Sequence, residues 1–332
     1  MQIRWGILGT GNIARQFANG VKSSRACVLT AVASRTAATA EAFGAQYGIA
    51  RAYNDYGTML ADPTVDAVYV SLPNTMHHEW TIKALRAGKH VLCEKPLATS
   101  SAQAEEMFAI AQQTGRVLIE AFMYRCHPQT LAVVDAVRRG AIGTPRLVRT
   151  SFCYRTTKIK DNIRFNPALA GGALMDVGCY CLSFSRLIAG GEPTAAQAVG
   201  VRQHGVDVAV SGSLKFEKDL TASFTCAMNT QSDNAALICG DEGWIRVSVP
   251  WKPTGVSSGY TIERQTPPRQ DNSGRGPLPL ETIVVPASGD VYGIEADAFA
   301  AVIGGTAVPF VTPADSLGNM RLLERLQASL IC

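Results

Sequence analysis

The chain has 332 residues, of which 47% are hydrophobic and 17% charged, and its formal net charge is +4 at pH 7. This length suits about two domains of roughly 100–200 residues each, and the low charge content excludes a disordered chain. Because the positive charge is small and forms no long basic run, general binding to nucleic acid is not expected.

The sequence also bears on location and metal binding. No uncharged apolar run approaches the roughly 20 residues that cross a bilayer, and the first residues lead into a predicted strand without a signal-peptide pattern. Nine cysteines are scattered along the chain without CxxC or Cys/His ligand spacing. We therefore expect reduced cysteines, no metal site, no membrane contact and a cytoplasmic location.

The first third of the chain alternates short apolar runs with helical patterns. Strands are predicted over 3–8, 27–33, 66–72, 90–93 and 116–120, and helices over 12–23, 36–47, 75–87 and 100–114. Strands that alternate with helices indicate a parallel sheet covered on both faces. We assign residues 1–122 to an α/β domain with a doubly wound sheet.

The pattern then changes to strands that follow one another directly. Helices are predicted over 129–138, 173–189, 292–303 and 313–331, and strands over 146–154, 195–201, 206–216, 220–228, 235–239 and 244–249. Residues 252–279 are rich in Pro, Gly and Ser and predict a long surface loop. Residues 123–332 are therefore predicted to form an α+β domain with a large open, mostly antiparallel sheet, its last helix packing back on the first domain through a leucine stripe.

A glycine-rich turn follows the first strand. Residues 9–14 follow the pattern G-x-G-x-x-A between a strand and a helix. Gly9 permits a tight turn, Gly11 lets the backbone approach a pyrophosphate, and Ala14 allows the helix to pack closely on the strand. This context favours a dinucleotide site over a turn that binds nothing.

The end of the second strand distinguishes NADP from NAD. An NAD site usually has Asp or Glu there to bind the ribose 2′-hydroxyl, whereas this chain reads Ser34-Arg35-Thr36. Arg35 can clamp a 2′-phosphate and Ser34 can donate a hydrogen bond to it, so we predict NADP in preference to NAD. The alternative is an arginine that only caps a surface turn.

Two further segments end the third and fourth strands, at the carboxyl edge of the predicted sheet where ligands bind. LPNT at 72–75 is followed by His77, which can approach a cofactor. EKP at 94–96 places Lys95 where it can hold a substrate hydroxyl and lower the pKa of a neighbouring proton carrier. Taken alone, EKP favours a structural ion pair before a helix.

Asp176 and Tyr180 lie four residues apart in a predicted helix, a spacing that puts both on one face. A carboxylate and a phenol beside a lysine form an acid/base set suited to hydride transfer. A buried Tyr–Asp hydrogen bond within a core explains the spacing equally well.

With these segments in order, the chain resembles the Gfo/Idh/MocA oxidoreductases, the glucose–fructose oxidoreductase and inositol dehydrogenase family. The resemblance covers nearly the whole length and includes GILGTGNIA, SLPNTMHHEW, HVLCEKPLA, EAFMYRCHPQ and GGALMDVGCYCLSFSRL. The last two segments are most similar to the branch of dimeric dihydrodiol dehydrogenases and NADP-dependent D-xylose dehydrogenases. The resemblance implies a Rossmann domain followed by an open-sheet domain, through which we expect a homodimer or tetramer.

The resemblance also implies roles for individual residues. Lys95, Tyr180 and Asp176 are expected at the reacting centre, with Tyr180 at a position where many members have His. Arg164, Phe165 and Tyr292 are candidates for the substrate pocket, with solvated loop residues as the alternative. The residues expected to hold the cofactor are Gly9, Thr10, Gly11, Asn12, Ile13, Ser34, Arg35, Leu72, Pro73, Asn74, His77, Glu94, Lys95 and Arg125.

The implied reaction is hydride transfer between NADP and a hydroxyl or carbonyl carbon of a sugar or cyclic diol, such as xylose, glucose or a trans-dihydrodiol. Tyr180 is expected to exchange the hydroxyl proton. Since a phenol has a pKa of about 10, Lys95 is expected to lower that pKa and polarise the substrate oxygen. Two alternatives are an enzyme that retains its nicotinamide for coupled redox or glycoside cleavage, and a non-catalytic NADPH sensor.

Overall fold

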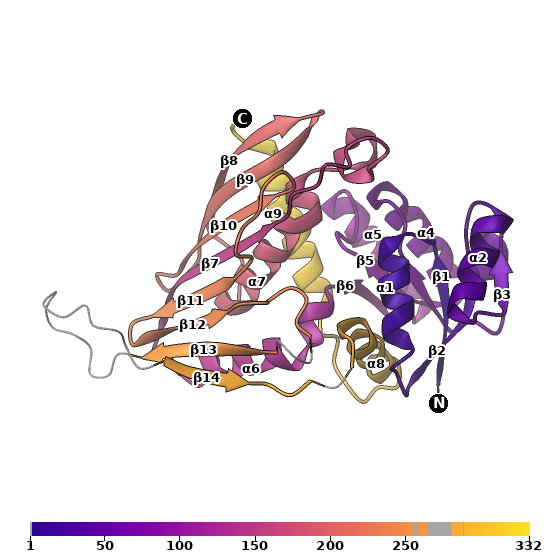
Figure 1. Cartoon of the computed structure of the whole chain (residues 1–332), viewed down its shortest axis with the longest axis horizontal. Coiled ribbons are helices and arrows are strands. Elements are labelled where there is room, and N and C mark those ends of the chain that lie inside the picture. The colour runs from indigo at the N-terminus through magenta and orange to yellow at the C-terminus, as the bar shows by residue number, and fades with distance from the viewer. Residues whose placement is uncertain (1, 255–257, 265–279, 288) are drawn as a thin grey trace, which may run out of the picture. The chain divides into compact units, whose positions relative to one another are not determined.

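The computed structural model describes residues 2–254, 258–264, 280–287 and 289–332. The chain forms two compact units (Figure 1). Unit 1 comprises Met1–Cys126 and Gly289–Arg321, and unit 2 comprises His127–Ser288 and Leu322–Cys332. Residues 123–126 and the segment from Gly289 to Arg321 thus belong with the first unit, outside the predicted range 1–122.

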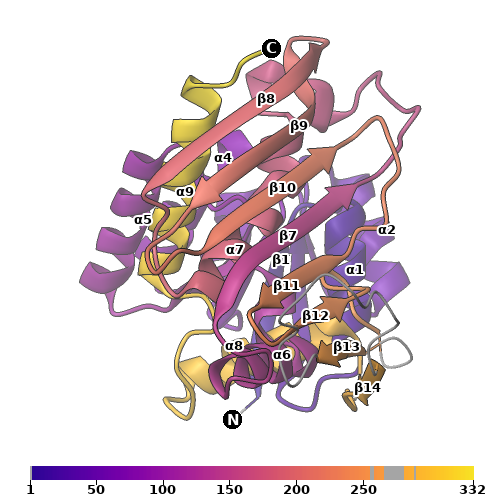
Figure 2. The same ribbon diagram turned by 90° about the vertical axis from the view of Figure 1, so that its left-hand side faces the viewer.

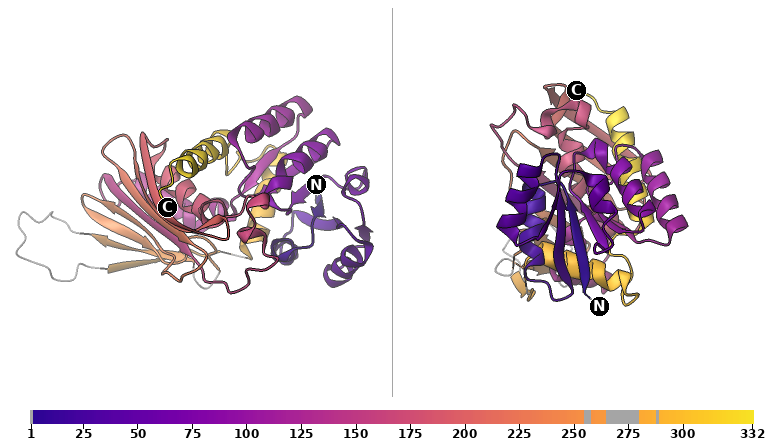
Figure 3. Two further views of the ribbon diagram at one scale, coloured as in Figure 1. Left: turned by 90° about the horizontal axis from the view of Figure 1, so that it is seen from above. Right: turned by 90° about the vertical axis from the view of Figure 1, so that its right-hand side faces the viewer.

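Unit 1 is built on a six-stranded parallel sheet in the order β3-β2-β1-β4-β5-β6. This is the Rossmann strand order. The strands are added on one side of β1 up to β3, and the chain then crosses to the other side of β1 to add β4, β5 and β6. Helices lie on both sides of the sheet (Figure 3, right). The strands are β1 (Ile3–Leu8), β2 (Cys27–Ala33), β3 (Arg51–Tyr53), β4 (Ala67–Val70), β5 (His90–Glu94) and β6 (Leu118–Ala121).

The helices of unit 1 pack in pairs, α1 along α8 and α4 along α5. Gly20 of α1 and Gly293 of α8 make the first pair close, because a Cβ on Gly293 would lie 2.6 Å from the carbonyl oxygen of Gly20. The helices are α1 (Asn12–Val21), α2 (Ala37–Tyr47), α3 (Tyr56–Leu60), α4 (Asn74–Arg86), α5 (Ser101–Thr114), the 3₁₀ turn η1 (Met123–Cys126), α8 (Val291–Ile303) and the first part of α9 (Pro313–Ala328).

The predicted strands and helices of residues 1–122 are all present, and two short elements were missed. β3 and α3 lie between α2 and β4, where no element was predicted. β3 has three residues, is an edge strand and is largely exposed, so it lacks the buried apolar run that identifies a central strand. The residues of β4, by contrast, are all buried, as expected for a parallel strand covered on both faces.

Unit 2 contains an eight-stranded sheet in the order β14-β13-β12-β11-β7-β10-β9-β8. β7 and β10 pair in parallel, and the other neighbours are antiparallel. The predicted mostly antiparallel sheet is therefore confirmed. The strands are β7 (Pro145–Cys153), β8 (Ala195–Gln203), β9 (Val206–Lys215), β10 (Thr221–Ala227), β11 (Ala236–Gly240), β12 (Gly243–Val247), β13 (Gly259–Arg264) and β14 (Leu280–Val284).

The predicted loop over 252–279 is wrong in part. Residues Gly259–Arg264 form β13, which pairs with β12 and β14. The strand was missed because the loop was predicted from the Pro, Gly and Ser content of the whole segment, which outweighs the few apolar residues of the strand. Residues 265–279 lie outside the described part of the chain.

The helical segments of unit 2 lie on one side of its sheet, and α7 packs against β7 and β10. They are α6 (Pro128–Arg138), the 3₁₀ turns η2 (Ile163–Phe165) and η3 (Pro167–Leu169), the π-helical turn η4 (Leu174–Gly178) and α7 (Cys179–Ala189). The other face of the sheet is turned toward the viewer in Figure 2, with α7 behind the strands. The strands fan out with a twist when seen from above (Figure 3, left).

Two helical segments bear on the predictions about membrane contact and the last helix. Residues 167–189, which include the charged Asp176 and Arg186 and so are not an uncharged run, are long and apolar enough to cross a membrane by length and composition, but 72% of the most apolar window is buried inside the protein. That burial is typical of a core segment. Helix α9 is divided between the units after Arg321, so Leu322, Leu323 and Leu326 of the predicted stripe belong with unit 2.

Candidate active site

The turn between β1 and α1 has the geometry of a dinucleotide cradle. Gly9 has φ +99°, and a Cβ there would lie 3.0 Å from the carbonyl oxygen of Ser71, so a side chain would be strained. A Cβ on Gly11 would meet no atom within 4 Å. Gly11 is the N-cap of α1, which has no side-chain cap. The first-turn N–H groups of α1 and the space beside Gly11 therefore suit a pyrophosphate.

Hydroxyl groups and a guanidinium gather where β2 ends. The Oγ of Ser34 lies 2.6 Å from the Oγ1 of Thr39 and 3.4 Å from the Oγ1 of Thr10. Thr36 caps α2 by accepting a hydrogen bond from the N–H of Thr39, and Arg35 is exposed. A cation and hydroxyls, with no carboxylate among residues 34–36, suit a phosphate monoester.

His77 joins the loops that follow β4 and β5. It is buried in the first half of α4, with its Nε2 2.8 Å from the carbonyl oxygen of Leu72 and its Nδ1 2.9 Å from that of Pro96. Burial lowers the pKa of His77, and the two contacts with carbonyl oxygens oppose this shift because they favour N–H groups on the ring. Pro73 is the N-cap of α4 and Asn74 its first residue. The histidine thus fixes the spacing of the LPNT and EKP segments.

The EKP turn is held from both neighbouring strands. The carboxylate of Glu94, buried at the end of β5, accepts a hydrogen bond from the hydroxyl of Tyr69 in β4. The N–H of Leu97 donates to the Oε1 of Glu120 in β6 at 2.9 Å. Lys95, between these anchors, is half-buried. A lysine in this place directly follows a parallel strand, at the same sheet edge as the cradle.

Sequence analysis missed a buried carboxyl group in α8. Glu295 is fully buried, and neither of its oxygens has a hydrogen-bond partner among the described residues. Burial, together with the negative charge of Glu94, raises the pKa of Glu295 well above its usual value. The one sequence signal is a glutamate within the apolar helix VYGIEADAFAAVI. The group is expected to be protonated at neutral pH.

We expect Glu295→Gln to stabilise the protein above about pH 5 and to matter little below it. Unfolded glutamate ionises near pH 4.3, whereas the folded group keeps its proton, so stability falls with rising pH by about 1.4 kcal/mol per pH unit until the folded group titrates. Glutamine does not ionise, so the unfolding free energy of the variant lacks this dependence on pH. Urea unfolding from pH 4.5 to 8 measures the difference in unfolding free energy between Glu295→Gln and wild type. The control is Glu41→Gln, at an exposed residue of α2. Parallel stability curves for wild type and Glu295→Gln would contradict the assignment.

Tyr292 and Arg125 are placed in unit 1. Tyr292 is buried at the contact of α8 with α1, and its hydroxyl lies 3.3 Å from the Oε1 of Gln16. Burial raises the pKa of Tyr292, so its hydroxyl stays protonated. Arg125 is buried in η1, and its guanidinium pairs with the carboxylate of Asp315 in α9 at 3.2 Å. Each side chain thus has a partner within the unit.

In unit 2, one carboxylate oxygen of Asp176 collects two donors. The hydroxyl of Tyr154 lies 2.7 Å from the Oδ2 of Asp176, and the Nε of Arg164 lies 2.8 Å from the same oxygen. Burial raises the pKa of Tyr154, and the charge of Asp176 raises it further, so the tyrosine remains a donor. Tyr154 was not a predicted site residue, since nothing in its local sequence links it to a residue 22 positions away.

The helix that carries Asp176 and Tyr180 changes form between them. Leu174–Gly178 is π-helical, and the α-helix begins at Cys179. The Oδ2 of Asp207 accepts the N–H of Leu174 at 2.7 Å, and a Cβ on Gly172 would lie 2.3 Å from the Oδ1 of Asp207. Glycine at 172 therefore makes room for this cap. π-helical turns are frequent at functional sites.

Aromatic rings surround Tyr180. The Tyr180 side chain is buried, with its ring 5.2 Å from that of Phe152 and 6.0 Å from that of Trp251, both edge-on. Trp251 is fixed by its indole N–H, which donates to the carbonyl oxygen of Ser151 at 2.8 Å. The phenol ring of Tyr180 is thus positioned by packing.

Phe165, the other aromatic candidate in unit 2, packs edge-on against His204, with 5.9 Å between the ring centroids.

The predicted residues therefore fall into two sets. All predicted cofactor residues, with Lys95 and Tyr292, belong to unit 1, and Asp176, Tyr180, Arg164 and Phe165 belong to unit 2. Within unit 1 the structure brings the cradle, LPNT and EKP to one sheet edge. Within unit 2 it brings Arg164 onto Asp176. Across the part of the chain that the structure describes, no three His, Cys, Asp or Glu side chains form a group able to hold a metal ion.

The chain matches two protein-family models. Residues 3–122 match the oxidoreductase family with an NAD-binding Rossmann fold, and residues 130–246 match the GFO/IDH/MocA C-terminal domain. Together these matches cover well over half of the chain.

The chain is also similar to individual proteins. It is 32% identical over 332 residues to a D-xylose 1-dehydrogenase (NADP(+)) of Haloferax volcanii, covering 98% of this chain and 96% of that one. It is 34% identical to the trans-1,2-dihydrobenzene-1,2-diol dehydrogenase of Mus musculus, covering 76% and 77%. The structure of KijD10, a 3-ketoreductase from Actinomadura kijaniata in complex with NADP and TDP-benzene, is similar with a TM-score of 0.87 and 32% identity, covering 100% and 98%.

Proposed function

The chain belongs to the GFO/IDH/MocA oxidoreductase family, and we propose that it transfers hydride between NADP and a hydroxyl or carbonyl carbon of a sugar or cyclic diol. One observation carries the proposal. The cradle after β1, LPNT after β4 and EKP after β5 all lie at the carboxyl ends of adjacent parallel strands. That edge is where a Rossmann sheet binds its dinucleotide.

The cofactor is NADP in this proposal, and its nicotinamide supplies the hydride acceptor or donor when bound. The first-turn N–H groups of α1 hold the pyrophosphate beside Gly11, and Ser34 and Arg35 hold the 2′-phosphate. The xylose dehydrogenase relative, which is named for NADP(+), supports this choice. So does the absence of Asp or Glu from residues 34–36.

The catalytic roles go to three side chains. Lys95 stabilises negative charge on the substrate oxygen, and Tyr180 removes the hydroxyl proton in oxidation or returns it in reduction. Asp176 touches Arg164 and Tyr154 through one oxygen, so we assign it the positioning of the turn before Tyr180. The names of the relatives support a sugar or dihydrodiol as the substrate.

The direct test follows reduced-nicotinamide absorbance with NADP and a panel of aldoses, inositols and trans-dihydrodiols, with NAD as the control. The matching ketones and lactones with NADPH test the reverse direction. Turnover of an aldose or dihydrodiol with NADP supports the proposal. Absence of turnover across both panels would overturn it in favour of a retained nicotinamide or a sensor.

Gly11→Ala separates cofactor binding from folding. Gly11 has φ −70° and ψ −177°, a conformation that alanine adopts, and a Cβ there meets nothing in the protein. We expect the unfolding free energy to change by less than about 1 kcal/mol, because the poorer N-cap preference of alanine opposes its lower chain entropy in the unfolded state. The Kd for NADPH should rise at least about tenfold, because the methyl group occupies the space for the pyrophosphate. Isothermal titration and urea unfolding measure the two effects.

Gly9→Ala is the matched comparison for Gly11→Ala. Its positive φ and the 3.0 Å approach to Ser71 predict a loss of stability of about 1 kcal/mol or more. If Gly11→Ala leaves the Kd for NADPH unchanged, the proposal that the pyrophosphate binds beside Gly11 is wrong.

Arg35→Ala tests the preference for NADP. We expect kcat/KM for NADP to fall about tenfold to a hundredfold, because a charge-assisted contact to the 2′-phosphate is lost. kcat/KM for NAD should change by less than about twofold, because NAD lacks that phosphate. Steady-state kinetics give kcat/KM for NADP and for NAD, and hence the preference for NADP over NAD. An equal fall of kcat/KM with both cofactors would exclude a contact between Arg35 and the 2′-phosphate.

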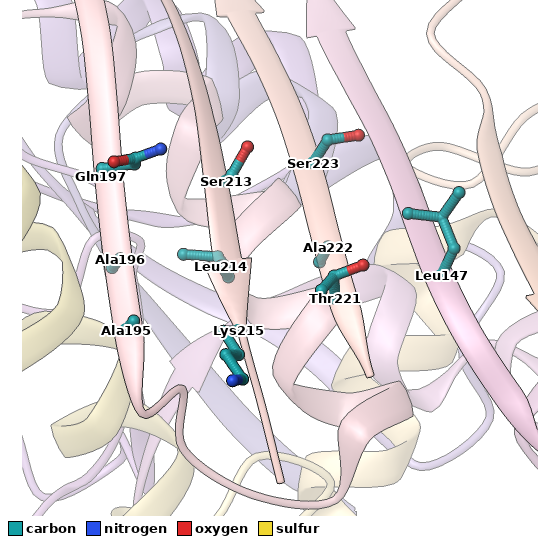
Figure 4. Close-up of a pocket in the computed structure, with 10 residues that line it drawn as sticks. All are labelled: Leu147, Ala195, Ala196, Gln197, Ser213, Leu214, Lys215, Thr221, Ala222 and Ser223. Carbon is teal, nitrogen blue, oxygen red and sulfur yellow. The ribbon is translucent and has the colours of Figure 1, made fainter. Parts of the chain in front are cut away.

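The open face of the sheet in unit 2 is proposed as the surface that joins two copies of the chain. A shallow groove there is lined by small, mostly uncharged side chains, and Figure 4 shows Gln197, Ser213 and Ser223 side by side on β8, β9 and β10. Val199 and Val201 of β8 are more than half exposed on the same strand. Analytical ultracentrifugation of wild type and Val199→Lys tests the assembly, and a monomeric wild type would overturn it.

A cytoplasmic location is also proposed. Among the described residues the nine cysteines form no disulfide bond, and seven of them are buried, which suits a reducing compartment. Cell fractionation tests it, and recovery in a secreted fraction would contradict it.

A further inference from the structure

A basic loop follows β7 in unit 2, and its formal charge accounts for most of the net positive charge of the chain. Residues 155–164 contain Arg155, Lys158, Lys160 and Arg164 against the single carboxylate of Asp161. Four cations and one anion leave this loop with a formal charge of +3, whereas the whole chain has +4. The rest of the protein is therefore close to electrical balance.

The basic loop is attached at both ends to the site carboxylate. Tyr154, just before it, and Arg164, its last residue, both donate to the Oδ2 of Asp176, at 2.7 and 2.8 Å. The carbonyl oxygen of Arg164 accepts the N–H of Gly172 at 2.9 Å. The loop is thus held against the turn that precedes Tyr180.

Bonds within the basic loop fix its course between these ends. The side-chain amide of Asn162 donates to the carbonyl oxygen of Lys158 at 2.8 Å, and its Oδ1 accepts the N–H of Arg164 at 3.1 Å. Lys158 and Lys160 are exposed. Their ammonium groups are therefore presented on a braced segment that begins and ends at the site.

Most cations of the basic loop have no carboxylate beside them. Within the described residues, Arg155, Lys158 and Lys160 form no ion pair, whereas Arg164 pairs with Asp176. Four other arginines of unit 2 pair with nearby carboxylates, namely Arg139 with Asp135, Arg146 with Asp219 and Asp241, Arg186 with Glu192, and Arg246 with Asp233. Three cations within six residues, with no carboxylate paired to them, make an anion beside them favourable.

We propose that the basic loop selects a sugar substrate that carries a phosphate group, with Lys158 and Lys160 contacting the phosphate while the reacting carbon lies toward Tyr180. The inference rests on the proposed function, since it assigns the far end of the same substrate. A phosphate has up to two charges and several acceptor oxygens, which suits two flexible ammonium donors. A neutral sugar offers these cations no comparable partner.

The test compares kcat/KM, with saturating NADP, for glucose, glucose 6-phosphate and a nucleoside diphosphate glucose. We expect one of the phosphorylated sugars to exceed glucose by about tenfold or more, and the advantage to shrink as salt rises from 50 to 500 mM, where screening is strong. The monophosphate and the nucleotide sugar distinguish the two sources of the phosphate.

The variant Lys158→Gln/Lys160→Gln should bring the ratio of phosphorylated to neutral kcat/KM close to one. Arg138→Gln/Arg139→Gln, on the exposed end of α6, removes the same charge and should leave the ratio unchanged. Equal kcat/KM for all three sugars, or a variant that raises KM for NADP alone, overturns this inference but not the proposed function. Absence of turnover for every sugar and diol overturns the proposed function and this inference with it.

Discussion

Replacing Tyr180 with phenylalanine is expected to lower kcat by about 10²–10⁴-fold, the range that a positioned acid or base contributes. The substitution removes one hydroxyl and keeps the ring that packs against Phe152 and Trp251. The fold and the Kd for NADPH should therefore remain as in the wild type. Steady-state kinetics, NADPH titration and thermal unfolding measured together isolate the lost proton transfer.

The matched control for this experiment is Tyr154→Phe, which removes a hydroxyl from the same carboxylate neighbourhood. Tyr154 contacts Asp176, which is assigned to positioning, so the loss of kcat in Tyr154→Phe should be smaller than that in Tyr180→Phe. Near-normal turnover by Tyr180→Phe would refute the acid/base assignment, and a larger loss in Tyr154→Phe would move that role to Tyr154.

Lys95→Ala is expected to reduce kcat by more than Tyr180→Phe does. The lysine is assigned two effects, stabilisation of charge on the substrate oxygen and support of proton transfer. Removal of one preorganised electrostatic group alone costs about 10²–10³-fold, and impaired proton transfer adds to it. The NADPH Kd should change by less than about tenfold, because the pyrophosphate and 2′-phosphate contacts of the proposal lie elsewhere.

Lys95→Arg provides the comparison that keeps the charge. We expect it to recover part of the activity lost in Lys95→Ala, but not all of it, because a guanidinium fork cannot take the place of a compact ammonium group. If both variants retain wild-type kcat, EKP is only a structural turn held by Tyr69 and Glu120. Equal, complete loss in both with a disturbed fold would also point to a structural role, and circular dichroism distinguishes that case.

The Rossmann unit could be predicted from the sequence because its signals are local. Each central parallel strand is buried on both faces and appears as a short apolar run, as in Ala67–Val70. The Gly9–Gly11 turn joins β1 and α1 within a few residues. Each of these patterns is complete within a stretch of chain shorter than about 15 residues, so no long-range contact is needed to recognise it.

Elements without a local apolar signal were missed or misplaced. β3 has three residues, mostly exposed on a sheet edge, and β13 lies in a segment whose Pro and Gly predict a loop. Both strands exist because a neighbouring strand offers its backbone groups, β2 to β3 and β12 to β13. That pairing depends on the sheet already being present.

In the candidate site, too, local sequence shows some features, whereas others depend on contacts between residues far apart in the chain. The residue types of the cradle, EKP and the Asp176–Tyr180 pair are visible in the sequence, but their partners are not. Asp176 is contacted by Tyr154 and by Arg164, and Tyr292 reaches Gln16 across 276 positions of the chain. Glu295 looks like one polar residue in an apolar helix, and only packing reveals that both of its oxygens are buried without partners among the described residues.

The sequence by itself determined the order of the central strands and main helices, the dinucleotide turn and the identity of the acid/base candidates, because these depend on backbone preference and residue chemistry within one or two turns of chain. The tertiary structure decided which residues support them: His77 between two loops, Asp207 on the π-helical turn, and the basic loop fixed to Asp176. Those contacts depend on distance in space, burial and the loss of water around charged groups, and all three are set only when remote segments pack together.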